Sequence, residues 1–184
     1  CDSRRVRFLN CQDCAAELEK GIAIIRELQA LAATDQCCAL PVSKLKIGLK
    51  CGGSDGLSGI TANPLCGRVT NRLAAMGGSA VLTEVPEMFG AEQLLMNRCT
   101  SQDVFDRAVR LINNYKNYFL DHHQPVSENP SPGNKAGGIT TLEEKSLGCG
   151  QKGGTAPITA VLDYGDRVTE PGLSLLGGPG NDMV

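Results

Sequence analysis

The fold is decided by the stretch LKIGLKCGGSD at residues 45–55. Residues 45–49 form a short apolar-rich run that predicts a strand, and Cys51-Gly52-Gly53 predicts a tight turn directly after it. Ser54 or Asp55 can then cap a helical stretch that continues to residue 75. A strand, a glycine turn and a helix in this order are typical of one unit of an α/β domain.

The same alternation continues on both sides of this stretch. We predict further strands at residues 6–10, 80–85 and 173–176, with 158–162 fitting either a strand or a helix. Helices are expected at residues 13–33, 91–98, from 101 onward and 140–148. Strands that alternate with helices predict a three-layer α/β fold, with a largely parallel, Rossmann-like sheet and helices on both faces.

We expect residues 1–184 to be a single α/β core domain within a longer enzyme. It divides into a lead-in strand and helix at 1–40, central βα units at 41–123 and a glycine-rich, loop-rich part at 124–184. Residues 177–180 predict a tight turn and Asn181-Asp182 a helix cap, after which no helix body follows. We therefore expect the chain to be a fragment, and to be inactive without the rest of the protein.

Composition narrows the class of partner. The chain has 184 residues, a formal net charge of -2 and 4% aromatic residues, which argues against nucleic acid or an anionic membrane surface as a partner. No apolar run approaches the length of a membrane span. The 22 glycines point to backbone turns, rather than aromatic platforms, as the source of specificity.

Two of the nine cysteines differ from the others in their setting. Cys11 and Cys14 form a C-x-x-C pattern, but the chain has no second pair to complete a zinc site. We expect most of the thiols to be reduced and to act as small apolar side chains. Cys51 and Cys149 each lie in a glycine-rich turn, where a thiol can bind a metal or react.

Polar residues follow the predicted strands, at the sheet edge where α/β proteins bind ligands. Amide groups around Ser54 and Asp55 could hold a carboxylate. Glu84 and Glu87 flank a proline turn, and paired carboxylates serve as metal ligands or as a general base. The alternative is that both are solvated glutamates at a strand end.

Two later segments carry further candidates. Residues 129–138, NPSPGNKAGG, are polar and contain one cation, Lys135, so they could orient a polyhydroxy substrate or form a surface linker. Glu144 and Lys145 precede Cys149 on a predicted helix. Glu144 also fits a capping box with Thr141, and Lys145 also fits a solvated helix charge.

Four stretches together resemble the altronate and galactarate dehydratase family. They are KLKIGLKCGGSDGLSGITANPL (44–65), VLTEVPEMFGAEQLLMNRC (81–99), ENPSPGNKAGGITTLEEKSLGCGQKGG (128–154) and GLSLLGGPGND (172–182). The resemblance implies dehydration of a hexonic sugar acid such as D-altronate to a 2-keto-3-deoxy acid, 2-keto-3-deoxy-gluconate. It also implies Fe²⁺ or Mn²⁺ as cofactor, the bacterial cytoplasm as location and a homo-oligomer.

The resemblance assigns roles to the candidate residues. The metal ligands would be Cys51, Glu84, Glu87 and Cys149, with Glu84 or Glu87 as an alternative base. Acid–base work would fall to Glu144 and Lys145. The groups that bind the substrate's carboxylate and hydroxyls would be Ser54, Asp55, Asn63, Asn134 and Lys135.

Other functions stay open at this point. Galactarate dehydratases resemble the chain in the CGGSD, TANP and PGNK-x-GG elements and look different near Glu87 and Cys149. A sulfolactate sulfo-lyase subunit is another relative with a similar core. An iron–sulfur dehydratase would suit the many cysteines, but they lack the usual close ligand spacing. A non-catalytic binding or assembly module is the third alternative.

Overall fold

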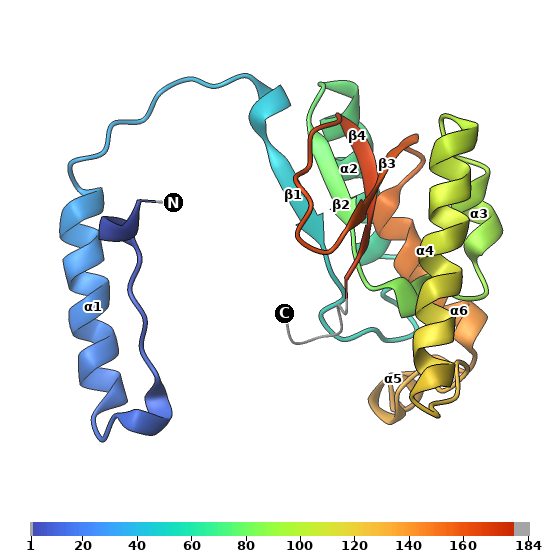
Figure 1. Cartoon of the computed structure of the whole chain (residues 1–184), viewed down its shortest axis with the longest axis horizontal. Coiled ribbons are helices and arrows are strands. Elements are labelled where there is room, and N and C mark those ends of the chain that lie inside the picture. The colour runs from blue at the N-terminus through green and yellow to red at the C-terminus, as the bar shows by residue number, and fades with distance from the viewer. Residues whose placement is uncertain (1, 179–184) are drawn as a thin grey trace. The chain divides into compact units, whose positions relative to one another are not determined.

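A sheet of four parallel strands organises the chain after residue 40 (Figure 1). The structure, a computed structural model, describes residues 2–178. The strands are β1 (Lys46–Leu49), β2 (Ser79–Leu82), β3 (Ile158–Asp163) and β4 (Gly172–Gly177), in the spatial order β1-β2-β4-β3. Residues 158–162 are therefore strand rather than helix, and the all-parallel sheet with its helices is consistent with the predicted three-layer α/β class.

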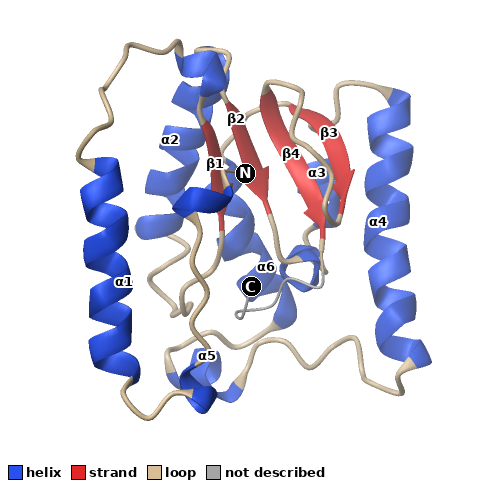
Figure 2. Ribbon diagram, turned by 60° about the vertical axis from the view of Figure 1, so that its left-hand side comes forward, coloured by secondary structure: helices blue, strands red, loops and turns tan. Residues whose placement is uncertain are grey.

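Five α-helices accompany this sheet in the described part of residues 41–178 (Figure 2). They are α2 (Ala62–Ala75), α3 (Glu92–Met96), α4 (Gln102–Asp121), α5 (Pro132–Ala136) and α6 (Leu142–Gly150). Three short 3₁₀ turns join them, η3 (Val42–Lys44), η4 (Val85–Met88) and η5 (Gln151–Gly153). The turns η4 and η5 matter most, because both carry charged residues of the site described below.

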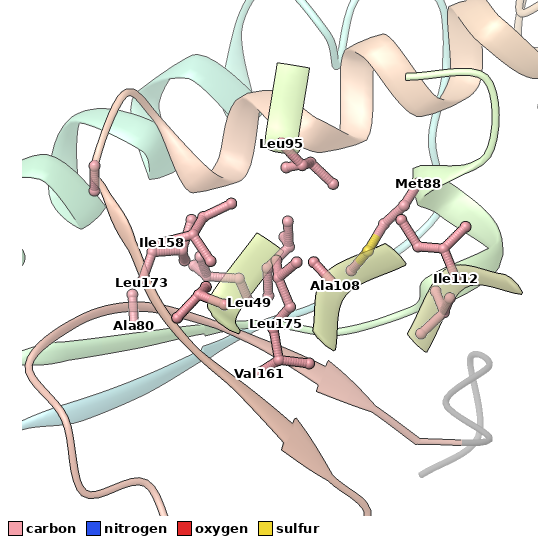
Figure 3. Packing of buried hydrophobic residues seen from close by; sticks show 14 of the residues in the cluster. Leu49, Ala80, Met88, Leu95, Ala108, Ile112, Ile158, Val161, Leu173 and Leu175 are labelled. Atoms are coloured by element: carbon pink, nitrogen blue, oxygen red, sulfur yellow. The ribbon is translucent and has the colours of Figure 1, made fainter. Parts of the chain in front are cut away.

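Alternate residues of the strands form one face of the core (Figure 3). Leu82 and Leu175 are paired across β2 and β4, and both are buried. They join Leu73 of α2 with Ala108 and Ile112 of α4 in one apolar cluster. Burying this apolar surface is the main term that holds the strands and helices together.

The structure forms two compact units by internal contacts, residues 1–40 and residues 41–184. In the first, α1 (Glu17–Ala32) follows two 3₁₀ turns, η1 (Ser3–Arg5) and η2 (Cys11–Asp13). An ion pair of 2.5 Å between Arg5 and Asp35, and another between Arg7 and Glu27, tie the lead-in segment to the helical part. The organisation as a single domain stays a prediction.

Three element predictions were wrong in detail. Residues 6–10 form no strand and pair with none of the described strands. The strand predicted at 80–85 ends at Leu82, because Glu84 has a left-handed backbone, φ 68°. The helix predicted after residue 55 begins at Ala62, since the Asp55 carboxylate accepts the Leu57 and Ser58 amides and closes a turn instead.

The polar loop and the C-terminal residues were also the subject of predictions. Residues 124–138 contain the short helix α5, capped by Ser131 and Asn134 in a capping box. The predicted turn at 177–180 lies partly, and the predicted cap at Asn181-Asp182 wholly, outside the described residues. Among residues 2–178, no helix is both long enough and apolar enough to cross a membrane.

A close backbone contact joins α2 to η5. A β-carbon on Gly67 of α2 would overlap the Gln151 carbonyl oxygen and would lie 2.9 Å from the Gly154 α-carbon. Thr70, one turn later, donates its hydroxyl to the Lys152 carbonyl at 2.8 Å. Only glycine allows this approach, so residue 67 fixes where η5 lies against the helix.

Replacing Gly67 with alanine tests this contact. Gly67→Ala in the full-length protein should lower the free energy of unfolding by about 1–3 kcal/mol, because the added methyl group must push backbone atoms apart. Urea unfolding measures the change. Gly48→Ala is the control, since its β-carbon would meet no atom within 4 Å. Equal stability of the two variants would contradict the contact.

Candidate active site

Four segments bring charged and thiol side chains to the carboxyl ends of β1 and β2. Cys51 and Ser54 follow β1. Glu84 and Glu87 follow β2, Glu84 directly before η4 and Glu87 within it. Helix α6 carries Lys145 and also Cys149, so the prediction that Cys149 lies in a turn was wrong, and η5 carries Lys152. The sheet edge where parallel strands end is the usual ligand site of α/β folds, so the location agrees with the prediction from sequence.

Glu84 fixes the loop after β1. Its left-handed backbone, φ 68° and ψ 68°, starts η4 and is uncommon for a residue with a side chain. The buried carboxylate accepts a hydrogen bond of 2.6 Å from the Cys51 backbone N–H. Backbone strain of this kind persists where the surroundings fix the conformation, here by the Cys51 amide and a nearby ammonium group.

Two buried lysines surround Glu87. The Lys145 ammonium lies 2.9 Å from Glu87 Oε1 and 2.9 Å from Ser54 Oγ, and it donates to Cys51 Sγ at 3.4 Å. The Lys152 ammonium lies 3.3 Å from Glu87 Oε2 and 3.6 Å from Glu84 Oε2. Each lysine is 3% exposed, so the ion pairs are what make burial of these charges tolerable.

The two thiols meet at Ser54. Its hydroxyl lies 2.8 Å from Cys51 Sγ and 3.5 Å from Cys149 Sγ. One ligand atom each from Cys51, Glu87 and Cys149 lies within 4.8 Å of the other two, a grouping that could hold a metal ion. Two sulfur donors and a carboxylate are chemically suited to a transition metal such as Fe²⁺.

The environment separates the pKa values of the two thiols. A hydrogen bond with Cys149, helped by Ser54 and Lys145 against the effect of burial, lowers the pKa of Cys51 to about 5. The same hydrogen bond, together with burial, raises the pKa of Cys149. The pair therefore holds one thiolate at neutral pH, on Cys51, where the serine hydroxyl and the ammonium lie.

The four charged groups are shifted by burial and by one another. Burial raises the pKa of Glu84 to about 7. Burial also acts to raise the pKa of Glu87, but the charges of Lys152 and Lys145 outweigh it and lower that pKa. For both lysines burial opposes the charge, yet Glu87 leads the interactions that raise their pKa values. Glu87 is thus a carboxylate beside two ammonium ions.

A cavity of about 640 Å³ opens in front of this cluster. Cys51, Ser54, Glu87 and Lys145 contribute to its wall, and residues 124–137 contribute much of the rest. A second cavity of about 430 Å³ shares Ser54 and Lys145 and also reaches Cys149. Neither cavity is lined by Glu84 or Lys152, which lie behind the wall.

Two of the predicted substrate-binding residues line the larger cavity but are also engaged in the fold. Asp55 accepts amide hydrogen bonds within its own turn. Asn134 donates to the Ser54 carbonyl at 2.9 Å, which joins α5 to the loop after β1. Both therefore shape the cavity whether or not they touch a ligand.

Three predicted residues lie away from the cluster. Asn63 donates to the Gly148 carbonyl at 3.0 Å and lines only the second cavity. Lys135 is exposed on α5 and lines neither of these two cavities. The exposed Glu144 carboxylate accepts from the Thr140 amide and hydroxyl, each at 2.8 Å, and so takes part in capping α6.

Lys152 is the residue that our reading of the sequence missed. It stands seven residues after Lys145 and three after Cys149. Spacings of i, i+4 and i+7 put three residues on one side of a helix. That pattern was the available signal, but the glycines between them argued against a continuous helical turn.

The chain belongs to the D-galactarate/altronate dehydratase family. Residues 42–184 match the family described as "D-galactarate/Altronate dehydratase, C-terminal". The chain is 59% identical over 181 residues to an altronate dehydratase of Bacillus subtilis, and 55% identical over 183 residues to one of Escherichia coli. A galactarate dehydratase (L-threo-forming) of Escherichia coli is 40% identical over 144 residues.

The matched regions differ in how much of each protein they cover. The two altronate dehydratase matches take in 98% and 100% of this chain, and the galactarate dehydratase match takes in 78%. The chain spans only 36%, 37% and 28% of these relatives' own lengths. The family membership predicted from the four sequence stretches is confirmed.

The lowered pKa of Cys51 predicts unusual thiol reactivity. In the full-length protein, the rate at which iodoacetamide alkylates Cys51 should rise with pH around a midpoint of about 5. Cys149→Ala should move that midpoint upward, because it removes the hydrogen bond that stabilises the thiolate. Peptide mass spectrometry at a series of pH values measures both. An unchanged midpoint in the variant would contradict the thiol pairing.

The raised pKa of Glu84 predicts a pH-dependent stability difference. Between its ordinary pKa of 4.5 and its folded value of about 7, the folded protein keeps a proton that the unfolded chain has released. Stability contributed by Glu84 is therefore lost as the pH rises through that window. Glu84→Gln lacks this loss, so its stability relative to the unsubstituted protein should be more favourable at about pH 8 than at about pH 4. Urea unfolding at both pH values tests the sign, and the reverse order would contradict it.

Proposed function

We propose that the protein containing this chain dehydrates a hexonic sugar acid, D-altronate, to 2-keto-3-deoxy-gluconate. The observation that carries the proposal is the Lys145–Glu87 ion pair on the cavity wall, in contact with Ser54 and next to the Cys51 thiol. Two relatives over nearly the whole chain bear the name altronate dehydratase. Their identity to this chain exceeds the 40% of the galactarate dehydratase, which favours the hexonate over the hexarate.

The ion pair supplies both proton transfers that dehydration requires. The reaction removes the C2 proton and expels the 3-hydroxyl, which leaves as water once it has gained a proton. The enol that remains tautomerises to the keto acid. In our proposal Glu87, kept ionised by its lowered pKa, accepts the C2 proton, and Lys145, kept protonated by its raised pKa, donates to the departing hydroxyl. At 2.9 Å, a proton then passes from Glu87 to Lys145 and restores both.

The cavity is suited to hydroxyl groups. Ser54, Asp55 and Asn134 lie on its wall with Asn129 and Ser131 from the polar segment. These side chains offer hydrogen-bond donors and acceptors that can pair with the hydroxyl groups of a sugar acid. We propose that Ser54 and Asn134 orient the substrate. Lys135 and Glu144 have no role in the proposed reaction.

Cys51, Cys149 and Glu87 fit a divalent metal ion in donor type and proximity. We propose Fe²⁺, with Mn²⁺ as the alternative, because thiolates favour the softer ion. Such a cation supplies Lewis-acid stabilisation of charge that develops next to the substrate's carboxylate. Glu87 Oε1 faces Lys145 and Oε2 faces Lys152, and each carboxylate oxygen has two lone pairs, so Glu87 could hold an ion while it keeps both ammonium partners. Glu84 is not among these proposed ligands, because its carboxylate accepts the hydrogen bond from the Cys51 amide.

Location and assembly are further proposals. The family resemblance supports a cytoplasmic enzyme that acts as a homo-oligomer. Size-exclusion chromatography with light scattering on the full-length protein would test the assembly, and a monomer would contradict it.

Replacing Lys145 tests the proposed reaction directly. In the full-length enzyme loaded with Fe²⁺, Lys145→Met should lower kcat for keto-acid formation from D-altronate by about 100-fold to 10,000-fold, because the leaving hydroxyl loses its proton donor. Glu144→Gln and Lys135→Met are matched controls on the neighbouring helices, and each should stay within about threefold of the unsubstituted enzyme. Keto acid is measured by its semicarbazone absorbance.

The outcomes separate the alternatives. A Lys145→Met enzyme with nearly full activity would remove the ion pair from the reaction. Keto-acid formation from galactarate, but not from altronate, by the unsubstituted enzyme would instead overturn the choice of substrate.

A further inference from the structure

Lys152 is a buried ammonium that has no access to the cavity. It is 3% exposed, and it lines neither the 640 Å³ nor the 430 Å³ cavity. Its Nζ lies 3.3 Å from Glu87 Oε2 and 3.6 Å from Glu84 Oε2. It therefore touches the two carboxylates from behind, on the side away from where a substrate would bind.

The backbone around Lys152 is held from two directions. Thr70 of α2 donates its hydroxyl to the Lys152 carbonyl at 2.8 Å. The Arg98 guanidinium donates to the Gly153 carbonyl at 2.7 Å. The close contact at Gly67 adds a steric limit on the same turn. These contacts fix the backbone of the short turn from which the Lys152 side chain extends.

Lys152 provides positive charge to two buried carboxylates, Glu84 and Glu87. Glu87 has a second ammonium, Lys145, on its Oε1 atom, but Lys152 is the ion-pair partner of Glu84 among the described residues. Without Lys152, the two buried carboxylates would keep only Lys145, which pairs with Glu87, and like charges in a buried site repel strongly. Glu84 would turn away from Glu87, and the hydrogen bond that it accepts from the Cys51 amide would weaken.

We propose that Lys152 is a positioning residue for the dehydration: it holds Glu84 and Glu87 so that the Cys51 loop and the Lys145–Glu87 pair face the cavity. The inference rests on the proposed function and adds a residue to it. Because Lys152 does not reach the cavity, its loss should lower kcat and leave KM for the sugar acid nearly unchanged. Loss of a substrate-binding residue would do the opposite.

The experiment uses four forms of the full-length enzyme and one control. They are the unsubstituted enzyme, Glu84→Gln, Lys152→Met, the Glu84→Gln/Lys152→Met double variant, and Lys116→Met. Lys116 is the control because it also has a carboxylate partner, Glu92 at 2.6 Å, but lies outside the site. Circular dichroism melting checks the fold, and kcat and KM for D-altronate are measured for each form.

The expected pattern couples the two substituted residues. Lys152→Met should lower kcat by about tenfold or more with KM within about twofold, while Lys116→Met keeps both. The double variant should recover at least about threefold in kcat over Lys152→Met, because the neutral amide that replaces the Glu84 carboxylate no longer needs an ammonium partner. A kcat of Lys152→Met equal to that of the control, or a double variant no better than Lys152→Met, would overturn the proposal.

Two further measurements keep the test decisive. If Lys152→Met does not fold, the charge-balanced double variant replaces it: it must fold and have a lower kcat than Glu84→Gln, and equal kcat values would overturn the proposal. The alkylation rate of Cys51 can be measured even in a variant that has no enzymatic activity. It should rise by about fivefold in Lys152→Met, as the Cys51 loop loosens, and stay constant in Lys116→Met. If the unsubstituted enzyme dehydrates no sugar acid, the proposed function fails, and the alkylation rates alone decide the role of Lys152.

Discussion

Burial of two lysines against two glutamates is the constraint on which the site depends. Neither pair of like charges could be buried alone, because the cost of removing an unpaired charge from water far exceeds what packing returns. Lys145 pairs with one oxygen of Glu87 and Lys152 with the other, so each oxygen of the central carboxylate has an ammonium partner. The Cys51 thiolate lies at the edge of this balanced set, within reach of Lys145.

The fold serves this cluster through a few close backbone contacts. Parallel pairing of β1 with β2 sets the Cys51 loop beside Glu84, and the left-handed turn at Glu84 directs the carboxylate back to the Cys51 amide. Gly67 lets η5 approach α2, which places Lys152 behind the two carboxylates. The charges that are expensive to bury are thus carried on short, firmly anchored turns rather than on long flexible loops.

Much of the site could be predicted from sequence because parallel strands end at a common edge. That rule brought Cys51, Ser54, Glu84 and Glu87 to one place without any knowledge of side-chain directions. Lys145 and Cys149 were candidates from their residue types, and the structure shows that α6 carries both of them to the same place. The sequence could not predict in which direction each side chain points. Glu144 and Lys145 are neighbours on α6, yet one faces the cap and the other the cluster. Likewise, the prediction of a strand at residues 6–10 was wrong because a local apolar pattern cannot reveal whether a partner strand exists.

A crystal structure of the full-length Lys145→Met enzyme with D-altronate would test the central claim most directly. The substitution should stop turnover and so preserve the bound acid. The account predicts that the acid occupies the cavity in front of Cys51, with its hydroxyls on Ser54 and Asn134 and its C2 atom next to Glu87. Acid bound at a different place, with this cavity holding only solvent, would contradict the account.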